Sequence, residues 1–348
     1  MKKTATRLAD GRELLYYDSR DDVVRTAADR RPLPPAASTG EIRRDPLLGD
    51  DVVIASHRQA RTYHPPPGEC PLCPSRDGRT TEIPADDYEV VVFENRFPSL
   101  AGDTGRCEVV CFTADHDASF AALDEDRAAL VLAVWTDRTA ALAALDTVEQ
   151  VFCFENRGHE MGVTLGHPHG QVYGYPFVTP RTATTLARAA AHRERTGGRN
   201  LFDDTVAAER ADGRRIVLEG AHWTAFVPHA ARWPYEVHLH PRRRVPDLLA
   251  LDDAARTEFP QIYLELLRRF DRIFGPGRPP TPYVSAWHQA PLQHPHRTEF
   301  ALHLELFTIR RTAGKLKFLA GSESGMNVFI NDVPPETAAE RLREVASE

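Results

Sequence analysis

The residues best suited to chemistry lie in the stretch from Phe154 to Gln171, where two histidines flank a proline. In an extended backbone the side chains at positions i and i+2 point the same way, so His167, His169 and Gln171 are expected to face one spot. Pro168 favours that extended geometry, and the glycines around it let a ligand approach the main chain. Imidazole serves as a nucleophile or a metal ligand. An ordinary turn that happens to contain histidines is the alternative, and this stretch alone does not exclude it.

Cys70 and Cys73 form a second pair of chemically capable side chains. A Cys-x-x-Cys pair indicates a zinc site, a redox pair or a coincidence. A redox pair normally opens a helix, and five prolines between residues 65 and 74 argue against a helix here. Zinc in a structural site takes four ligands, and His116 and His167 are the best candidates for the other two. Four protein ligands would leave no open position, so the predicted zinc is structural.

Composition sets bounds on the class of protein. A chain of 348 residues can hold one large domain or two ordinary ones, and 27% charged with 42% hydrophobic residues is typical of a globular protein. The net charge of -7 argues against nucleic-acid binding. We also expect no membrane span and no signal peptide, since the basic start has no apolar run behind it. Five cysteines do not suggest a secreted disulfide framework, so a cytoplasmic protein is predicted.

The expected elements divide the chain into four parts. Residues 1–40 are predicted to be a loosely packed N-terminal arm, and residues 181–212 a helical bridge. A helix is expected from the N-cap Asp124 to about Leu145, and a longer one from Asp252 to about Phe274. The expected strands span residues 52–54, 88–93, 107–112, 151–154, 216–218, 223–226 and 235–239.

The two long helices lie in segments that resemble each other. The runs "FAALDEDRAAL" and "LLALDDAARTE" align without a gap at an offset of 128 residues, which favours an internal duplication. The predicted fold is therefore α+β, with two homologous halves at 41–180 and 213–348. Each half is an antiparallel sheet packed with helices. Each half then continues into strands, with His167-Pro168-His169 in the first and Leu302–Leu306 in the second. Matching these strands places Glu305 opposite His169, so only the first half would carry a nucleophile.

Several motifs together resemble the galactose-1-phosphate uridylyltransferases of the histidine triad superfamily. They extend from Arg43 to Glu344 and read "RRDPLLGDDVVIASHRQAR", "CPLC", "VFENRFPSL", "FTADH", "FENRGHEMGVTLGHPHGQ", "WHQAP" and "KFLAGSESG". The resemblance implies a fold of two histidine-triad-like halves. It also implies transfer of a uridylyl group from UDP-glucose to galactose 1-phosphate, by a ping-pong route through a uridylyl-histidine.

The resemblance assigns roles to particular residues. His169 is the expected nucleophile, because a neutral imidazole is reactive near neutral pH, and His167 then turns to the zinc. Asn95 is expected to face the uridine, while Lys317 and Glu323 would reach the sugar phosphate of the other subunit in a homodimer. The full set of expected substrate-binding residues is Arg58, Arg61, Asn95, Asn156, Gly162, Val163, Thr164, Gln171, Lys317 and Glu323.

Gln171 helps to discriminate between reaction types. Hydrolases of this superfamily carry a third histidine at that place, and glutamine cannot shuttle a proton, so a transferase is favoured over a water-using enzyme. One alternative is a nucleotidyltransferase or phosphorylase acting on ADP-glucose or another nucleotide sugar. Another is a nucleotide-binding module without catalysis.

Some members of the family bind a second metal, iron. They bind it through a glutamate and three histidines, of which His288 and His303 remain here. Glu305 stands where the third histidine is expected, and Thr185 lies near the place of the glutamate. We therefore expect the second metal to be absent or weakly bound.

Overall fold

The computed structural model describes residues 1–35, 40–60 and 64–347 of the chain. These residues form two compact units. The first unit comprises residues 1–153, 164–183 and 291–294, and the second comprises residues 154–163, 184–290 and 295–348. The units therefore differ from the continuous halves expected at 41–180 and 213–348. Residues 154–163 belong to the second unit, and residues 291–294 belong to the first. Arg61, one of the expected substrate-binding residues, lies outside the described residues.

The first unit is built on an antiparallel sheet with the strand order β1-β2-β5-β6-β8-β7. A separate hairpin, β3–β4, lies before the sheet's third strand in sequence. The elements are β1 (Lys2–Arg7), β2 (Glu13–Asp18), β3 (Glu41–Arg44), β4 (Asp51–Ile54), β5 (Val90–Glu94), β6 (Arg106–Cys111), α1 (Glu125–Ala143), β7 (Gln150–Arg157) and β8 (His169–Tyr175).

The prediction of a loosely packed arm over residues 1–40 is wrong for its first half. Strand β2 pairs with β1 on one side and with β5 on the other. Leu14, Tyr16 and Tyr17 of β2 are buried, so this strand belongs to the core. Its neighbour β1 alternates between half-buried and exposed residues, as an edge strand does. Because β1 is polar, the short apolar run in β2 after it was not recognised as a strand.

The second unit has a sheet with the strand order β12-β13-β11-β10-β9. The predicted helical bridge over residues 181–212 is occupied by two helices, α2 and α3. The elements are α2 (Pro180–Thr196), α3 (Leu201–Asp212), β9 (Ile216–Glu219), β10 (Trp223–Phe226), β11 (Tyr235–Pro241), α4 (Asp253–Arg272), β12 (Tyr283–His288), β13 (His303–Thr308), β14 (Arg310–Thr312), β15 (Lys315–Leu316), α5 (Gly321–Met326) and α6 (Pro335–Glu344).

The two units share one folding plan. In each, two paired strands lead into a long helix and then into two further strands: β5-β6-α1-β7-β8 and β10-β11-α4-β12-β13. Asp124 and Asp252 cap the two helices in the same way, each accepting a hydrogen bond from the backbone N–H three residues on. The α+β class and the pair of homologous halves are therefore confirmed.

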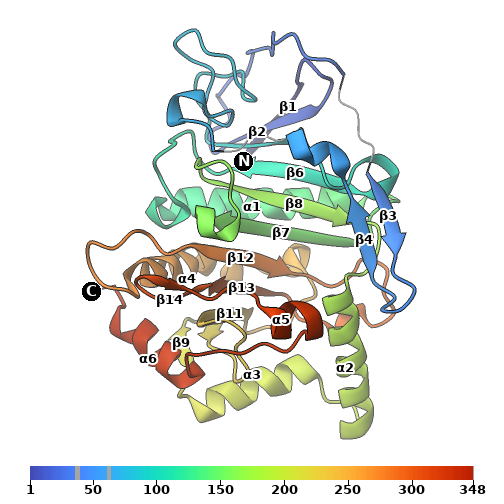
Figure 1. The fold of residues 1–348 in the computed structure, drawn as a ribbon, viewed down its shortest axis with the longest axis vertical. Coiled ribbons are helices and arrows are strands. Elements are labelled where there is room, and N and C mark those ends of the chain that lie inside the picture. The colour runs from blue at the N-terminus through green and yellow to red at the C-terminus, as the bar shows by residue number, and fades with distance from the viewer. Residues whose placement is uncertain (36–39, 61–63, 348) are drawn as a thin grey trace. The chain divides into compact units, whose positions relative to one another are not determined.

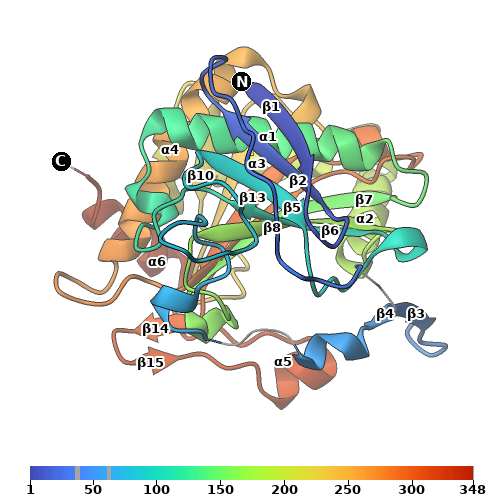
Figure 2. The same cartoon turned by 90° about the horizontal axis from the view of Figure 1, so that it is seen from above.

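Helix α1 covers one face of the first unit's sheet, as Figures 1 and 2 show. It contacts β5 and β8, and its buried side chains include Val131, Val134 and Trp135. The other face of the sheet carries a second group of buried apolar side chains, among them Val91, Phe93 and Val109. Within the described part of the chain, no helix is long and apolar enough to cross a membrane.

Candidate active site and metal centre

Strand β8 presents its polar side chains on the face away from α1. Its residues alternate between half-buried and buried along the strand. Gly174 belongs to the buried set, and a Cβ there would lie 2.8 Å from Val148 and 3.3 Å from Leu142 of α1. Side chains on a strand alternate between faces, so His169, Gln171 and Tyr173 share the opposite face. The strand thus aligns the expected nucleophile with the expected phosphate ligand.

His169 is held in a single tautomer. Its Nδ1 lies 2.8 Å from the backbone oxygen of His167, and a carbonyl oxygen only accepts, so Nδ1 carries the proton. Nε2 therefore keeps its lone pair. Burial lowers the pKa of His169 below its ordinary value, which keeps the ring neutral at physiological pH. A neutral imidazole with a fixed Nε2 lone pair is what a nucleophilic histidine requires.

The amide of Gln171 is also oriented. Its Oε1 accepts hydrogen bonds from Asn95 Nδ2 at 3.5 Å and from the Tyr173 hydroxyl at 3.3 Å. Both contacts are at the long end of the hydrogen-bond range, and together they direct the amide NH₂ group of Gln171 away from these two neighbours. That group can then donate to a phosphoryl oxygen.

Arg58 joins the same network through a residue that the sequence did not single out. Its guanidinium donates to the Ser99 hydroxyl and to the Phe97 carbonyl, and Ser99 Oγ lies 3.4 Å from the Tyr173 hydroxyl. Tyr173 follows His169 by four residues and so shares its face of β8, a periodicity that could have identified it. Ser99 lies in the motif "VFENRFPSL", but no role was assigned to it from the sequence.

Five of the expected substrate-binding residues belong to the second unit. Asn156, Gly162 and Val163 lie in its segment 154–163, and Lys317 and Glu323 near its end. Lys317 Nζ lies 2.6 Å from Glu323 Oε1, and both side chains are buried. This ammonium group lowers the pKa of Glu323. Thr164 lies in the first unit, where its carbonyl accepts from the His64 backbone N–H.

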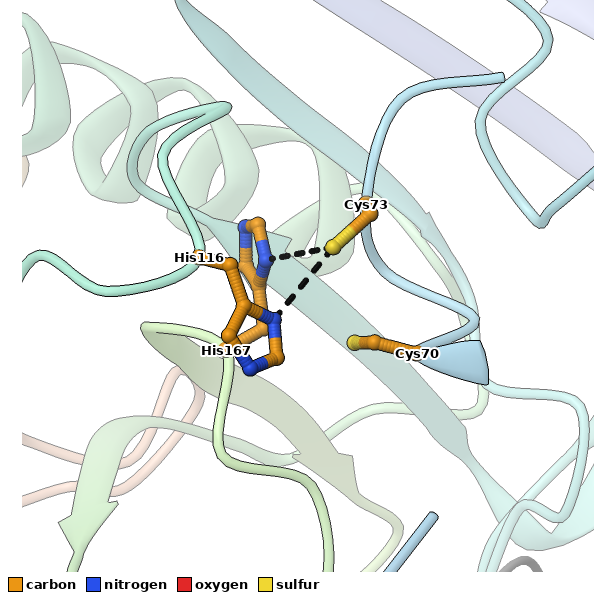
Figure 3. Close-up of side chains that lie close together, drawn as sticks. All are labelled: Cys70, Cys73, His116 and His167. Carbon is orange, nitrogen blue, oxygen red and sulfur yellow. Dashed lines mark hydrogen bonds between the residues drawn. The ribbon is translucent and has the colours of Figure 1, made fainter. Parts of the chain in front are cut away.

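The four residues expected to bind a metal lie together in the first unit (Figure 3). One donor atom from each of Cys70, Cys73, His116 and His167 lies within 4.8 Å of all the others. Cys73 Sγ is 3.3 Å from His116 Nδ1 and 3.6 Å from His167 Nδ1. Tetrahedral zinc with ordinary Zn–S and Zn–N bonds separates sulfur from nitrogen by about 3.5 Å. The donor spacing therefore fits a tetrahedral metal ion.

The surroundings of His167 support this arrangement. Its Nε2 lies 2.8 Å from the Thr113 carbonyl and 2.8 Å from the Tyr88 hydroxyl, and that hydroxyl in turn donates to Leu72 O. The Nε2 proton is thus used, and the lone pair is on Nδ1, toward Cys73. Outer hydrogen bonds of this kind orient metal-binding histidines. His167 and His169 therefore do not face one spot, contrary to the expectation from strand periodicity, because β8 begins only at His169.

The electrostatics of the cysteines also favour a cation. Burial raises the pKa of the Cys70 thiol to about 11, so without a positive charge this group would remain a thiol. A divalent ion binds the thiolate and displaces its proton. Two thiolates and two imidazoles are the donor set of many structural zinc sites.

A second group of possible metal ligands lies in the second unit. His288, His303 and Glu305 each place a donor atom within 4.8 Å of the other two. Nε2 of His288 and Nε2 of His303 are each 3.4 Å from an oxygen of Glu305. His238 lies 3.5 Å from the same carboxylate, but its Nε2 is closer, at 2.9 Å, to Glu236.

The placement of Glu305 corrects the internal alignment. His169 and His303 are the first residues of β8 and β13, and the Nδ1 of each contacts the backbone oxygen two residues earlier. The position opposite His169 is thus occupied by His303, and Glu305 corresponds to Gln171. The sequence alignment was shifted by two residues, which preserves the face of a strand and so leaves no pattern to reveal the error.

Comparison with known proteins gives consistent matches along the chain. Family models for galactose-1-phosphate uridyl transferase match residues 100–179 (N-terminal domain) and 186–348 (C-terminal domain). A galactose-1-phosphate uridylyltransferase of Streptomyces lividans is 64% identical over 352 residues, covering 99% of this chain and 98% of the relative. The Thermotoga maritima enzyme of that name is 34% identical, covering 88% of this chain and 99% of its own.

The chain belongs to the galactose-1-phosphate uridylyltransferase family. A solved uridylyltransferase structure has 29% identity and a TM-score of 0.75, covering 87% of this chain and 97% of its own. Membership makes the protein a nucleotidyltransferase, as the resemblance implied, and disfavours the non-catalytic module.

Proposed function

We propose that this protein transfers a uridylyl group from UDP-glucose to galactose 1-phosphate through a covalent uridylyl-His169. The proposal is supported by family membership. The observation that carries the mechanism is the contact between His169 Nδ1 and the His167 carbonyl, which leaves Nε2 as the free nucleophile.

In the first step His169 Nε2 attacks the α-phosphorus of UDP-glucose. A P–N bond forms while the P–O bond to glucose 1-phosphate breaks, and the leaving phosphate takes the bonding pair. The attached imidazole then carries a positive charge, and its Nδ1–H bond to the His167 carbonyl becomes charge-assisted and stronger. In the second step a phosphate oxygen of galactose 1-phosphate attacks the same phosphorus. The P–N bond breaks, UDP-galactose leaves and neutral His169 returns. Neither step needs a proton to leave Nδ1.

The other expected residues hold the phosphoryl oxygens and the base. The Gln171 amide would donate to a non-bridging oxygen of the α-phosphate, and Arg58 and Arg61 would offset charge. Asn156 and the backbone at 162–164 would contribute further contacts, and Asn95 is assigned to the uridine. Fixed donors of this kind stabilise phosphoryl transfer because they need not reorganise during the reaction. Glutamine, unlike histidine, cannot activate water, which is consistent with transfer.

We assign zinc to Cys70, Cys73, His116 and His167. Its role would be structural, because four protein ligands leave no position for substrate. The second group, His288, His303 and Glu305, offers two imidazoles and a carboxylate, which suits iron or zinc. With the family's third histidine replaced by Glu305, we propose that any ion there binds more weakly than the zinc. Metal analysis tests both sites: Cys70→Ser should lose the zinc, and His303→Ala should change only a second equivalent.

A cytoplasmic homodimer with shared active sites is also part of the proposal. It would place Lys317 and Glu323 against the partner's substrate. The segment around these residues carries exposed apolar side chains, including Phe318 at 72% and Met326 at 77% exposure. Apolar side chains gathered along one segment are typical of an interaction surface.

Labelling the covalent intermediate tests the mechanism. Incubation with UDP-glucose labelled at the α-phosphate should give an acid-labile, base-stable adduct on His169, whereas ADP-glucose should label poorly. His169→Gly should abolish the adduct and lower transfer by at least about 10³-fold, as for other removed nucleophiles. Added imidazole should partly restore uridylyl chemistry. His229→Gly, at an exposed histidine, is the matched control. An adduct that persists in His169→Gly refutes the assignment.

A further inference from the structure

Residues 154–163, which begin in the middle of β7, belong to the second unit and are held there by its other side chains. The Glu155 carboxylate is buried and accepts a hydrogen bond from the Tyr283 hydroxyl at 3.0 Å. Arg157 forms an ion pair with Asp271 of α4 at 2.9 Å, and its guanidinium lies over the Tyr283 ring. Residues 155 and 157 are thus fixed to β12 and α4, on either side of Asn156.

The next turn is held just as closely. Gly158 has φ of +91°, and a Cβ there would lie 2.7 Å from Pro282, so only glycine fits. A short turn, His159–Met161, follows. Glu160 of this turn points to Arg310 of β14, with Oε1 and Nη2 2.9 Å apart. The turn leads directly to Gly162 and Val163, whose backbone is expected to contact phosphate.

Arg310 is the centre of this anchor. Besides Glu160 it donates to the carbonyl oxygens of Pro279 and Pro280, at 3.1 and 3.3 Å. Its side chain is only 8% exposed and that of Glu160 15%. Proline carbonyls and one carboxylate thus satisfy a nearly buried guanidinium. Bonds from one planar guanidinium in several directions fix position as well as charge.

The same residue borders the segment that carries Lys317. Arg310 pairs with Leu316 across the β14–β15 hairpin, and the Lys317 backbone N–H donates to the Ile309 carbonyl at 2.6 Å. The side chain of Arg310 therefore holds the turn before Gly162, while its backbone lies beside the start of the Lys317–Glu323 segment.

We propose that Arg310 and Glu160 are a positioning pair for uridylyl transfer. The pair fixes the 159–161 turn, and with it the backbone donors that follow, in the arrangement that binds the phosphoryl oxygens. This inference rests on the proposed function, since it presumes that those donors contact the α-phosphate. Neither side chain touches the reacting atoms. Their effect is exerted through the position of the backbone, where an error of about 1 Å can cost about 100-fold in rate.

The test measures the rate constant of adduct formation on His169 with labelled UDP-glucose in a single turnover of the full-length protein. Glu160→Gln keeps the shape but removes the charge, and Arg310→Lys keeps the charge but cannot donate in all three directions. Each should lower the rate constant about 10- to 100-fold with little change in the UDP-glucose concentration needed for half-saturation. The double variant should lose less than the product of the two single losses, because the residues act as one unit.

Asp332→Asn is the matched control, since it breaks the exposed pair of Asp332 with Arg311, the next residue of β14. It should leave the rate constant unchanged. Circular dichroism and thermal unfolding show whether each variant is folded. Glu160→Gln and Arg310→Lys that are folded and react at the wild-type rate would overturn the positioning role. An unaltered adduct in His169→Gly would instead overturn the proposed function itself, so the two failures are distinguishable.

Discussion

His167 and His169 are two residues apart and yet suited to different chemistry, because different backbone carbonyls hold their protons. Thr113 O accepts from Nε2 of His167, which leaves Nδ1 for the cysteine cluster. The His167 carbonyl accepts from Nδ1 of His169, which leaves Nε2 for phosphorus. The tautomer of each ring is therefore determined by local backbone geometry, and the residue types alone do not reveal it.

The pH dependence of adduct formation follows from this arrangement. Only the neutral ring of His169 is nucleophilic, and burial lowers its pKa below the ordinary value of 6.5. As the pH falls from 8, the rate constant should therefore decline with a slope of one and a midpoint below pH 6.5. Single-turnover labelling across this range, with thermal unfolding at each pH as the control, measures it. A decline centred above pH 6.5 would contradict a desolvated His169.

At the residue scale the sequence predicted which side chains would form the site, but not the hydrogen bonds that connect them. His169, Gln171, Asn95 and Arg58 were expected from their motifs, and all four lie in the first unit. The links between them, Ser99 and Tyr173, were not expected, because hydroxyl side chains occur in many loops and strands and become informative only when their neighbours are known. The two-residue shift that placed Glu305 opposite His169 has a similar origin, since strand periodicity is blind to a shift by two.

At the scale of elements, the four possible metal ligands come from three segments of the first unit, and the loop that carries Cys70 and Cys73 also packs against β6 in a hydrophobic cluster. Cys70 and Cys73 lie in the loop before β5, whose described residues from 64 on include a short turn, Pro67–Glu69, and an isolated bridge between Pro74 and Ile83. His116 follows β6, and His167 precedes β8. A loop rich in proline lacks repeating backbone hydrogen bonds, so it is held by its packing against Val109 and Cys111 of β6, and a metal bound by the four ligands would add to that packing.

Removing the metal should therefore cost stability. A ligand present at about 1,000 times its Kd stabilises a fold by about 4 kcal/mol, and each kcal/mol is worth roughly 2–4 °C in Tm for units of this size. Cys73→Ser should lose the zinc and lower the Tm by roughly 10 °C. The buried Cys153, outside the cluster, offers a control: Cys153→Ala should keep the full metal content whatever its own Tm. Stoichiometric zinc in Cys73→Ser would contradict the ligand assignment.

The elements themselves were predicted unevenly. The helices capped by Asp124 and Asp252 stand out because an N-cap and apolar spacing agree. Strand β2 was missed although Leu14 to Tyr17 is apolar throughout. Its local partner β1 is polar and charged, and its other partner, β5, lies more than 70 residues away. Pairing over such a distance leaves no local signal, whereas a helix makes its hydrogen bonds within four residues.

At the scale of the whole molecule, the shared folding plan of the two units shows how a duplicated chain can divide its roles. The first unit holds the Cys70–Cys73–His116–His167 group and His169, the proposed nucleophile. The second has a histidine, His303, at the corresponding strand position, but its Nε2 is directed to Glu305, and Glu305 replaces the glutamine that would donate to phosphate. A carboxylate there repels a phosphoryl group. The second unit is thus unsuited to the same reaction, and in the proposed function it contributes Lys317, Glu323 and the exposed apolar side chains around them instead.

Subunit complementation tests whether those residues serve a partner's site. His169→Gly and Lys317→Ala should each be inactive alone. If one site combines His169 of one subunit with Lys317 of the other, a mixed dimer has one site with both residues intact and one with neither. Random mixing gives half mixed dimers, so about a quarter of the wild-type activity should return. The mixture is unfolded and refolded together, and activity is followed as dimers form.

The same experiment has an informative negative outcome. If each subunit contained a complete site, every subunit in the mixture would lack either His169 or Lys317, and activity would stay at the level of the separate variants. Phe318→Asp provides a second test, because replacing this exposed ring with a carboxylate should weaken association of two subunits through the apolar segment. Sedimentation should then show more monomer, and activity should fall with dimer content as the protein is diluted. Full activity in a monomeric Phe318→Asp would exclude a shared site even if His169 proved to be the nucleophile.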